Sequence, residues 1–256
     1  MSTFPLAAGR GREAVRHELV RRTVRVLGRA ELPGHLVRIT LGGDDLAGFT
    51  SVGPADHVKA FFPTTGGPVG RDYTPSEFRP VGASSGPELD LDFVVHGTDG
   101  PASAWALSAA PGDELTIGGP KGSRLAPTGY RNVLLIADGS GLPALRRWVR
   151  AYAGVVPVHA LLFGGAEAAG YLDDAELATA TPQVVTAEHD LLTVVGSQDV
   201  DDDTFVFAAG EAGALVEVRR WLKARLPKEN LSLHGYWKQG DPTFDHHAPL
   251  DPSDPD

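Results

Sequence analysis

The chain has no cysteine among its 256 residues. Disulfides, thiolate nucleophiles, zinc-thiolate centres and cysteine-ligated iron-sulfur clusters are therefore excluded. Redox chemistry would have to be carried by a bound cofactor. No apolar run approaches the roughly 20 residues of a membrane-spanning helix, and the first residues lack the apolar core of a signal peptide. We therefore expect a cytoplasmic protein without membrane insertion.

Basic residues are also scarce, since 23 Lys and Arg stand against 33 Asp and Glu and give a formal net charge of −10. Nucleic-acid binding usually needs a basic face, so a nucleic-acid partner is not expected. A small anionic ligand can still bind at a local basic patch. The 31 Gly and 20 Pro are scattered without a period, which indicates many turns between short strands.

The first half of the chain has the pattern of a β-rich domain. Strands are predicted at 23–27, 36–41, 57–62, 72–78, 89–95 and 114–117. A helix is predicted at 101–110, between Gly100 and the Pro111-Gly112 turn. This spacing predicts a closed or nearly closed antiparallel β-barrel at residues 19–127, preceded by a flexible arm at residues 1–18.

The second half alternates strands with helices, which predicts a parallel-sheet α/β domain at residues 128–240. Its strands are predicted at 132–137, 155–163, 183–186 and 204–209, with a short aromatic segment at 231–240. Residues 241–256 are acidic and rich in proline, and are predicted to form a flexible tail. The predicted fold class is thus a β-barrel followed by an α/β domain.

Arg71, Tyr73 and Thr74 lie on one predicted strand. Because side chains alternate between the two faces of a strand, Arg71 and Tyr73 share one face. The Thr74 hydroxyl and backbone remain free to contact the edge of a ring. A guanidinium suits a pyrophosphate and an aromatic ring suits a flavin. For these three residues alone, an ordinary edge strand with a surface arginine is the plainer explanation.

A second anion-binding device follows about twenty residues later. The strand that ends at His96-Gly97 precedes a helix that begins with the small residues Gly100, Pro101, Ala102 and Ser103. The N–H groups and the dipole of a helix N-terminus attract phosphates. A simple capped helix after a strand remains the alternative.

Two Gly-containing turns follow strands of the second half. The first contains Asp138 and Ser140, and the second is Gly210-Glu211-Ala212. In open α/β sheets, nucleotides bind at such carboxyl ends of strands. The spacing is not that of a Gly-x-Gly-x-x-Gly fingerprint, so it indicates a nucleotide site only weakly.

Six short motifs follow one another along the chain: Arg-x-Tyr-Thr at 71–74, His-Gly-x-Asp-Gly-Pro-Ala-Ser at 96–103, Gly-Gly-Pro-Lys-Gly-Ser at 118–123, a small-residue turn before Leu-Pro at 142–143, Ala-Gly-Glu-Ala at 209–212 and Gly-Tyr-Trp-Lys at 235–238. In this order they resemble the siderophore-interacting protein family, whose members are flavin-dependent ferric-siderophore reductases of the ferredoxin-reductase superfamily. The resemblance covers about residues 20–240. It implies an FAD-binding barrel, an NAD(P)H-binding α/β domain and a ferric siderophore as substrate, with NAD(P)H or a reduced ferredoxin-type protein as the electron donor.

The resemblance also implies roles for single residues. Arg71, Tyr73 and Thr74 would meet the pyrophosphate, the flavin ring and its N5 region, and residues 96–97 and 100–103 would hold the ribityl-phosphate part. The further cofactor-binding residues would be Asp138, Ser140, Gly210, Glu211, Ala212 and Trp237. Trp237 would shield the flavin, although a hydrophobic C-terminal anchor explains it equally well. No residue is expected to act as a general acid, a nucleophile or a metal ligand.

A cationic patch for an anionic ferric chelate would consist of Lys59, Lys238 and either Lys121 or Arg124. Taken singly, each of these side chains is more simply an exposed surface cation. His246 and His247 lie in the acidic tail, and we do not expect an iron site there.

Two departures from the family pattern matter. The family usually continues Arg-x-Tyr-Thr-x-Arg, whereas this chain has Ser76, so one phosphate contact is missing unless Arg79 supplies it. Restoring the family residue by Ser76→Arg is then expected to tighten FAD binding. The usual acidic residue after the second strand is absent from residues 161–165, which leaves the choice between NADH and NADPH open.

Two other functions remain open at this point. One is a general flavin reductase that serves a quinone, free flavin or a protein acceptor. The other is a protein that binds a ferric chelate without reducing it, an alternative that the Ser76 departure supports.

Overall fold

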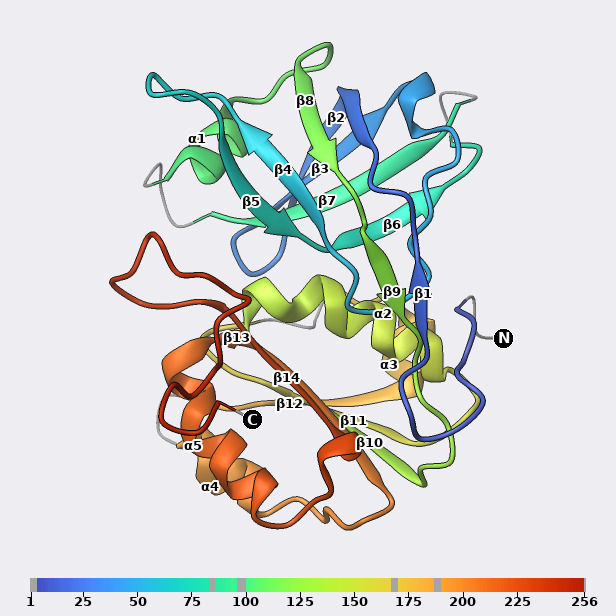
Figure 1. The fold of residues 1–256 in the computed structure, drawn as a ribbon, viewed down its shortest axis with the longest axis vertical. Coiled ribbons are helices and arrows are strands. Elements are labelled where there is room, and N and C mark those ends of the chain that lie inside the picture. Colours follow the sequence, from blue (N-terminus) through green and yellow to red (C-terminus); the bar gives the residue numbers. More distant parts are fainter. Residues whose placement is uncertain (1–3, 83–85, 96–99, 167–169, 187–189, 256) are drawn as a thin grey trace. The chain divides into compact units, whose positions relative to one another are not determined.

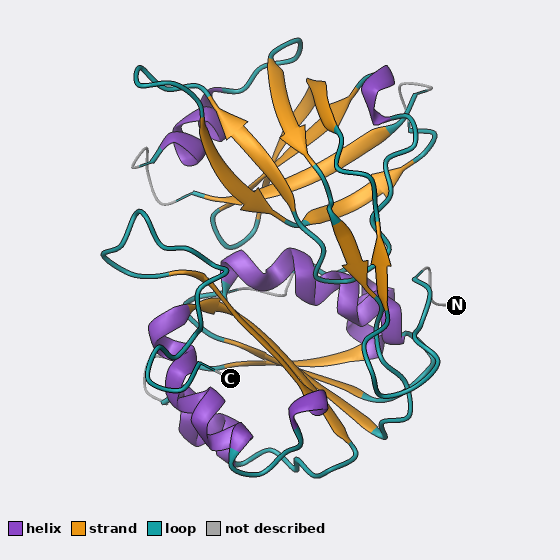
Figure 2. Cartoon of the chain, viewed as in Figure 1, coloured by secondary structure: helices purple, strands orange, loops and turns teal. Residues whose placement is uncertain are grey.

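The fold is described from a computed structural model of residues 1–256, in which residues 4–82, 86–95, 100–166, 170–186 and 190–255 are described. The chain divides into two compact units (Figures 1 and 2). Residues 13–125 form one, here called the barrel unit, and residues 1–12 with 126–256 form the other, here called the α/β unit. The arm predicted at residues 1–18 is thus divided between the two units.

The main sheet of the barrel unit is a curled antiparallel sheet with the strand order β5-β4-β8-β2-β3-β7-β6, which confirms the predicted class. Its strands are β2 (Arg21–Leu32), β3 (Leu36–Gly42), β4 (Val58–Phe62), β5 (Val69–Tyr73), β6 (Pro75–Arg79), β7 (Glu88–Val94) and β8 (Glu114–Gly118). Apolar side chains alternate along these strands and meet in a core in which Val24, Ile39, Phe62 and Leu91 are fully buried. Helix α1 (Pro101–Ser108) packs against β3, β4 and β7.

The strand predicted at residues 72–78 is in fact two strands. β5 ends at Tyr73, β6 begins at Pro75, and the two are opposite edges of the curled sheet. Proline has no N–H for a strand ladder and fixes its own φ, so the chain turns here instead of continuing. Thr74 therefore connects the two edges of the sheet.

A short ribbon in the barrel unit was not predicted. It pairs β1 (Ala14–Arg16) with β9 (Gly122–Arg124) in antiparallel register. Each strand has only three residues, too few for an alternating pattern to be recognised. The 3-10 turn η1 (Asp44–Leu46) follows β3.

The α/β unit confirms the predicted parallel sheet. The strand order is β12-β11-β10-β13-β14. The strands are β10 (Asn132–Ala137), β11 (Val158–Leu162), β12 (Ala180–Val184), β13 (Thr204–Glu211) and β14 (Leu231–Trp237). The order reverses between β10 and β13. Their adjacent carboxyl ends, here called the switch point, are the place at which such sheets bind ligands.

Helices cover both faces of this sheet (Figure 1). They are α2 (Leu142–Tyr152), α3 (Asp174–Thr179), α4 (Leu191–Gly196) and α5 (Ala212–Lys223), with 3-10 turns η2 (Gly139–Gly141) and η3 (Lys228–Asn230). On the α2 face, the ring centroids of Trp148 and Phe207 lie 5.3 Å apart. On the other face, α4 and α5 bury an aliphatic cluster that includes Leu215 and Val218. None of the helices in the described part of the chain is long and apolar enough to cross a membrane.

The chain after residue 240, predicted to be a flexible acidic tail, makes defined contacts with α5. Arg220 Nε donates to Asp251 Oδ2 at 2.6 Å, and Lys223 Nζ lies 2.7 Å from Asp254 Oδ2. The hydrogen bond from Arg220 holds the pKa of Asp251 well below its usual range. The basic side chains of this part of α5 are thus engaged by tail carboxylates.

Candidate functional site

Tyr73 presents a supported aromatic ring at the end of edge strand β5. Its ring centroid lies 4.4 Å from that of Phe93 and 5.9 Å from that of Phe62, so the core fixes the ring while it stays partly exposed. Burial raises the pKa of Tyr73 well above its usual value, so the phenol stays neutral. A fixed, neutral and partly exposed ring suits stacking on an isoalloxazine.

Arg71 lies on the same face of β5 as Tyr73. In the register with β4, Arg71 stands opposite Ala60 and Tyr73 opposite Val58, both of which are fully buried. Both side chains therefore start from the inner face of the curled sheet at its edge. Arg71 Nη1 donates to Gly70 O at 2.9 Å, and a guanidinium has five N–H donors, enough to hold this carbonyl and a phosphate together.

The start of α1 has features of an anion site in the described part of the chain. Gly100 caps the helix with φ 112°, and the structure records no side-chain capping bond there within the described residues. A Cβ at Gly100 would meet nothing within 4 Å. Pro101, Ala102 and Ser103 are small and at least half buried, so a phosphate could approach the first-turn N–H groups. His96 and Gly97 lie outside the described residues, and their roles stay predictions.

Thr74 is less accessible than the sequence suggested, because it is only 7% exposed at the turn between the two sheet edges. A flavin edge would therefore have to approach the turn itself in order to contact the Thr74 hydroxyl.

Arg79 does not take the place of the family arginine. It forms a fork with Asp90, at 2.8 and 2.9 Å, and pairs with Glu88 at 3.2 Å. The hydrogen bonds to Asp90 raise the pKa of Arg79 further above its already high value. Arg79 is therefore committed to the acidic strand β7 rather than available to a phosphate.

We predict that Ser76→Arg destabilises the barrel unit and does not tighten FAD binding, contrary to the expectation from the family pattern alone. Ser76 is 1% exposed and its Oγ donates to Asp90 O at 3.2 Å. Overpacking a core site costs about 1–3 kcal/mol, and a buried guanidinium adds desolvation. Thermal unfolding and FAD titration check this, with Ser76→Ala as the control. An unchanged Tm together with tighter FAD binding would contradict it.

Asp138, directly after β10, joins the carboxyl ends of three strands of the parallel sheet. Its Oδ1 accepts hydrogen bonds from Ser140 N at 2.8 Å, Ser140 Oγ at 2.6 Å and Gly141 N at 3.2 Å. Its Oδ2 accepts from Glu211 N at 2.8 Å and Trp237 Nε1 at 2.7 Å. The carboxylate is thus occupied within the chain, which suits a residue that shapes a nucleotide site more than one that touches the nucleotide.

Gly210 makes this arrangement possible. Its φ is 151°, and a Cβ would lie 2.6 Å from Asp138 Cγ and 2.8 Å from Phe163 Cζ. The next residue, Glu211, caps α5 by accepting from Ala214 N at 2.6 Å. Burial acts to raise the pKa of Glu211, but backbone donors, with Gln239 N first, outweigh burial and lower it. Any other residue at position 210 would push Asp138 out of place.

The structure thus gathers one predicted set of residues at the carboxyl edge of the parallel sheet. The set is Asp138, Ser140, Gly210, Glu211, Ala212 and Trp237. Trp237 remains 42% exposed although its indole N–H is bound. The sequence predicted these residues. It did not predict the hydrogen bond from the Trp237 indole to the Asp138 carboxylate, which links the first and the last of them.

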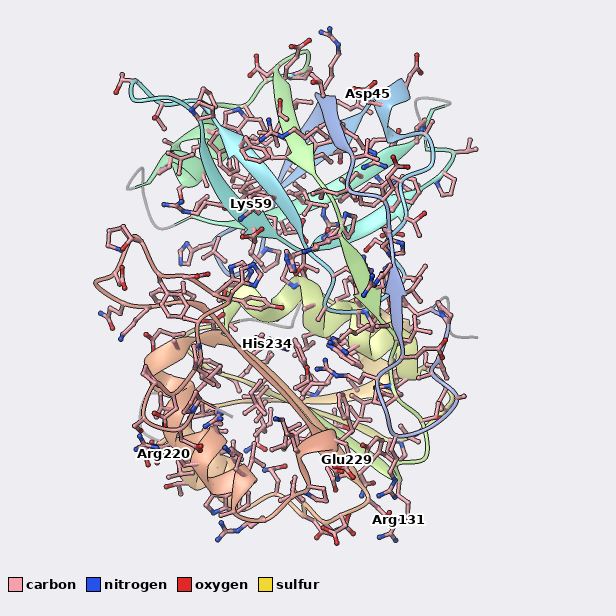
Figure 3. The ribbon with its side chains drawn as sticks, in the orientation of Figure 1. Asp45, Lys59, Arg131, Arg220, Glu229 and His234 are labelled. Carbon is pink, nitrogen blue, oxygen red and sulfur yellow. The ribbon has the colours of Figure 1, made fainter. Side chains whose placement is uncertain are left out.

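The predicted cations have different surroundings. Lys59 is labelled in Figure 3. Its Nζ lies 2.6 Å from Asp72 Oδ2, so its charge is compensated. The register places this pair on the face of the sheet opposite Arg71 and Tyr73. Lys121, Arg124 and Lys238 are exposed.

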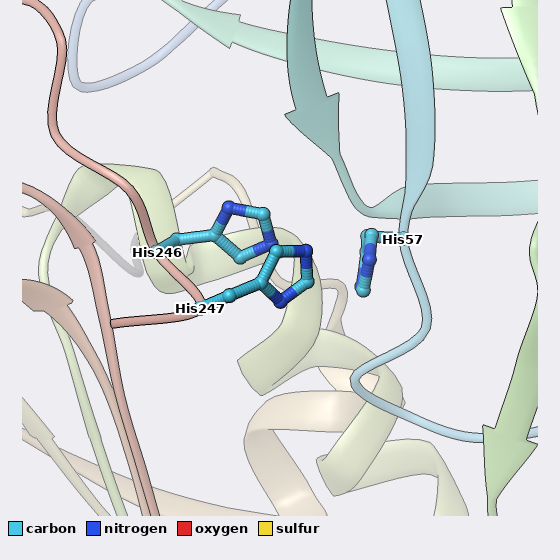
Figure 4. A group of neighbouring side chains, drawn as sticks. All are labelled: His57, His246 and His247. Atoms are coloured by element: carbon cyan, nitrogen blue, oxygen red, sulfur yellow. The ribbon is translucent and has the colours of Figure 1, made fainter. Parts of the chain in front are cut away.

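The two tail histidines lie together. The ring centroids of His246 and His247 are 3.9 Å apart. Figure 4 draws them with His57, which belongs to the barrel unit.

A cavity of about 140 Å³ lies elsewhere in the α/β unit, lined by residues that include Asn132, His159, Asp199 and Thr204. It lies at the amino ends of β10 and β13, opposite the Gly-containing turns, and is not part of the candidate site.

Comparison with known proteins decides the family. Residues 67–124 match the model for the siderophore-interacting FAD-binding domain, and residues 130–240 match the model for siderophore-interacting proteins. A solved structure of a siderophore utilization protein from T. fusca is 30% identical, with a TM-score of 0.80 over 93% of this chain and 100% of that one. The chain belongs to the siderophore-interacting protein family. The first match also confirms the expected FAD-binding domain.

Two curated relatives of this siderophore-interacting protein are named as reductases. The NADPH-dependent ferric-chelate reductase of Escherichia coli K12 is 41% identical over 156 residues, which are 53% of this chain and 58% of that protein. The ferric vibriobactin reductase ViuB of Vibrio cholerae is 27% identical over 244 residues, which are 80% of this chain and 85% of that protein. The aligned part thus spans little more than half of the Escherichia coli protein.

Proposed function

We propose that this protein is an FAD-dependent reductase that releases iron from an anionic ferric siderophore, with NAD(P)H as the electron donor. The observation that carries the proposal is that one chain presents two complementary sets of residues. The Arg71-Tyr73 edge of β5 offers a guanidinium and a supported ring, as a flavin nucleotide requires, and the switch point between β10 and β13 is the place at which such sheets bind nucleotides. Relatives named as ferric-chelate reductases support the choice of acceptor.

The chain would bind and orient its cofactors rather than react itself. FAD, when bound, supplies the electron transfer to ferric iron, which a chain without cysteine must take from a cofactor. Arg71 would bind the pyrophosphate, Tyr73 would stack on the ring, and the start of α1 would hold the ribityl-phosphate part. Reduction then releases the metal, because hard oxygen ligands hold iron(II) more weakly than iron(III).

The proposal extends to the electron donor and to the compartment in which the reaction takes place. NADPH or NADH would bind at the turns that Asp138 organises, and a reduced ferredoxin-type protein is the alternative donor. We place the reaction in the cytoplasm, where nicotinamide nucleotides are available. Parallel assays with NADPH, NADH and a reduced ferredoxin distinguish the donors.

Absorbance of the purified protein separates the main alternatives. Flavin bands, or their appearance after reconstitution with FAD, support a reductase. Failure to take up FAD would instead support a protein that binds ferric chelates without reducing them. A general flavin reductase would take up FAD but would need no cationic patch.

The ion pair of Lys59 and Asp72 predicts that substitutions of its two partners change the KM for an anionic ferric chelate in opposite directions. Asp72→Asn is expected to lower the KM for an anionic ferric chelate, because it removes the carboxylate that compensates Lys59. Lys59→Ala is expected to raise this KM several-fold, and Lys238→Ala should act in the same direction. The differences should shrink between about 0.05 and 0.5 M salt, because attraction between exposed charges is screened.

Initial rates with ferric citrate as the anionic chelate, at matched flavin content, check this prediction. The neutral ferric tris-acetohydroxamate is the control and should show little change. Equal KM values for ferric citrate in the wild type and both Lys59 and Asp72 variants at low salt would remove Lys59 from the substrate site.

A further inference from the structure

Two segments of the barrel unit that carry predicted substrate cations are joined by a buried hydrogen bond. Asp56 begins the segment that ends in Lys59, and Ser123 lies between Lys121 and Arg124. Ser123 Oγ donates to Asp56 Oδ2 at 2.5 Å. Asp56 is 4% exposed and Ser123 is 2% exposed, so the bond is shielded from water.

His17 extends this bond into a chain of three side chains. Its Nε2 lies 2.7 Å from Ser123 Oγ, and Val52 N donates to the same oxygen at 3.2 Å. A serine hydroxyl can donate one hydrogen bond and accept two. Because the Asp56 carboxylate can only accept, Ser123 donates to Asp56 and accepts from His17 and Val52. His17 must therefore carry a proton on Nε2.

The backbone around these three hydrogen-bonded side chains is closely packed as well. Ser51 Oγ and Gly53 N each donate to Asp56 Oδ2 at 3.0 Å. A Cβ at Gly53 would lie 2.6 Å from Arg124 O, so the loop at 51–56 lies directly against β9. β9 pairs with β1, and His17 follows β1 by one residue. Three distant segments are thus fixed to one another.

We propose that His17, Ser123 and Asp56 are positioning residues for the ferric chelate, which hold the segment with Lys59 and the segment with Lys121 and Arg124 at one spacing. The inference rests on the proposed reduction of an anionic chelate. The cations are exposed, whereas the three positioning side chains are buried or half buried and need not touch the substrate. Fixing the cations beforehand lowers the ordering cost of binding an anion at several points.

The charge of the substrate cations and the spacing between them affect different kinetic quantities. Long-range attraction depends on charge and is screened by salt, whereas close contact depends on spacing. Ser123→Ala leaves the net charge unchanged, so it should raise the KM for ferric citrate by about 2- to 10-fold, as expected for one lost hydrogen bond. It should retain the wild-type kcat and the wild-type salt dependence of kcat/KM. Arg124→Gln should instead weaken the salt dependence itself.

Two further variants test the link. His17→Ala should act like Ser123→Ala, and His17→Gln should restore most of the loss, because a glutamine amide can donate to Ser123 from a similar position. Ser51→Ala is the matched control: it removes a donor to Asp56 but leaves the bond between the two segments, so its KM should stay near the wild-type value.

The experiment measures steady-state kinetics of these variants with ferric citrate and with neutral ferric tris-acetohydroxamate, together with Tm and flavin content. A raised KM for ferric citrate alone, with rescue by His17→Gln, supports the proposal. A wild-type KM in folded Ser123→Ala and His17→Ala overturns it, and so does an equal loss with both chelates accompanied by a fall in Tm. If Ser123→Ala does not fold, the His17 pair decides.

Failure of the proposed function would look different. Wild-type protein that reduces neither chelate would contradict ferric-chelate reduction itself. Equilibrium binding of ferric citrate to the wild type and to His17→Ala would then decide the positioning role. Equal affinities would overturn it, and weaker binding by the variant would support it.

Discussion

Arg71→Ala and Tyr73→Ala are each expected to lower FAD affinity by about 10- to 100-fold. The first removes a charge-assisted phosphate contact, typically worth about 1.5–3 kcal/mol. The second removes a ring that the core holds 4.4 Å from Phe93 and leaves the flavin without its stacking surface. Flavin content after gel filtration, followed by titration with FAD, measures both effects.

Two conservative variants serve as controls for this prediction. Tyr73→Phe keeps the ring against Phe93 and should retain most of the FAD affinity. Arg71→Lys keeps the charge but loses the planar fork, so its affinity should fall between those of the wild type and Arg71→Ala. Wild-type FAD occupancy and affinity in both alanine variants would show that the flavin binds elsewhere.

Asp138→Ala is expected to raise the KM for the nicotinamide nucleotide by at least about tenfold and to leave FAD affinity nearly unchanged. The substitution removes the acceptor of the turn N–H groups and of the Trp237 indole. Each buried donor left without a partner costs about 1–3 kcal/mol, so the turns around the switch point should lose their shape and Tm should fall. Nucleotide kinetics, flavin content and tryptophan fluorescence measure the three consequences.

Trp237→Phe isolates one part of this network. It keeps an aromatic side chain but removes the N–H that donates to Asp138. Its effect on the nucleotide KM should be smaller, because Asp138 still accepts from Ser140, Gly141 and Glu211. A nucleotide KM that is unchanged in Asp138→Ala, with FAD lost instead, would contradict the assignment of the nucleotide site to the switch point.

The strands could be predicted where a regular pattern is long enough to recognise. β10 begins and ends as predicted because its apolar run is bounded by Arg131 and Asp138. α3 and α4 were missed because six residues carry too little of a helical period. The break at Thr74 was missed because it depends on Pro75, which interrupts a stretch that otherwise reads as one strand.

The contacts of the candidate site could not be predicted from the sequence, because hydrogen-bonded residues lie far apart in the chain. Asp138 and Trp237 are 99 residues apart, and His17 and Ser123 are 106 residues apart. Only the fold brings such pairs together. The pairing of Lys59 with Asp72 follows from strand register, which an alternating pattern does not determine.

Anaerobic incubation of the FAD-loaded protein with NADPH and ferric citrate, in the presence of a chromogenic iron(II) trap, tests the central claim most directly. A nicotinamide gives up two electrons and each iron takes one. We therefore expect two ferrous ions for each NADPH oxidised, and none when FAD has been removed. Oxidation of NADPH without trapped iron(II), or binding of ferric citrate without oxidation of NADPH or of NADH, would contradict ferric-chelate reduction.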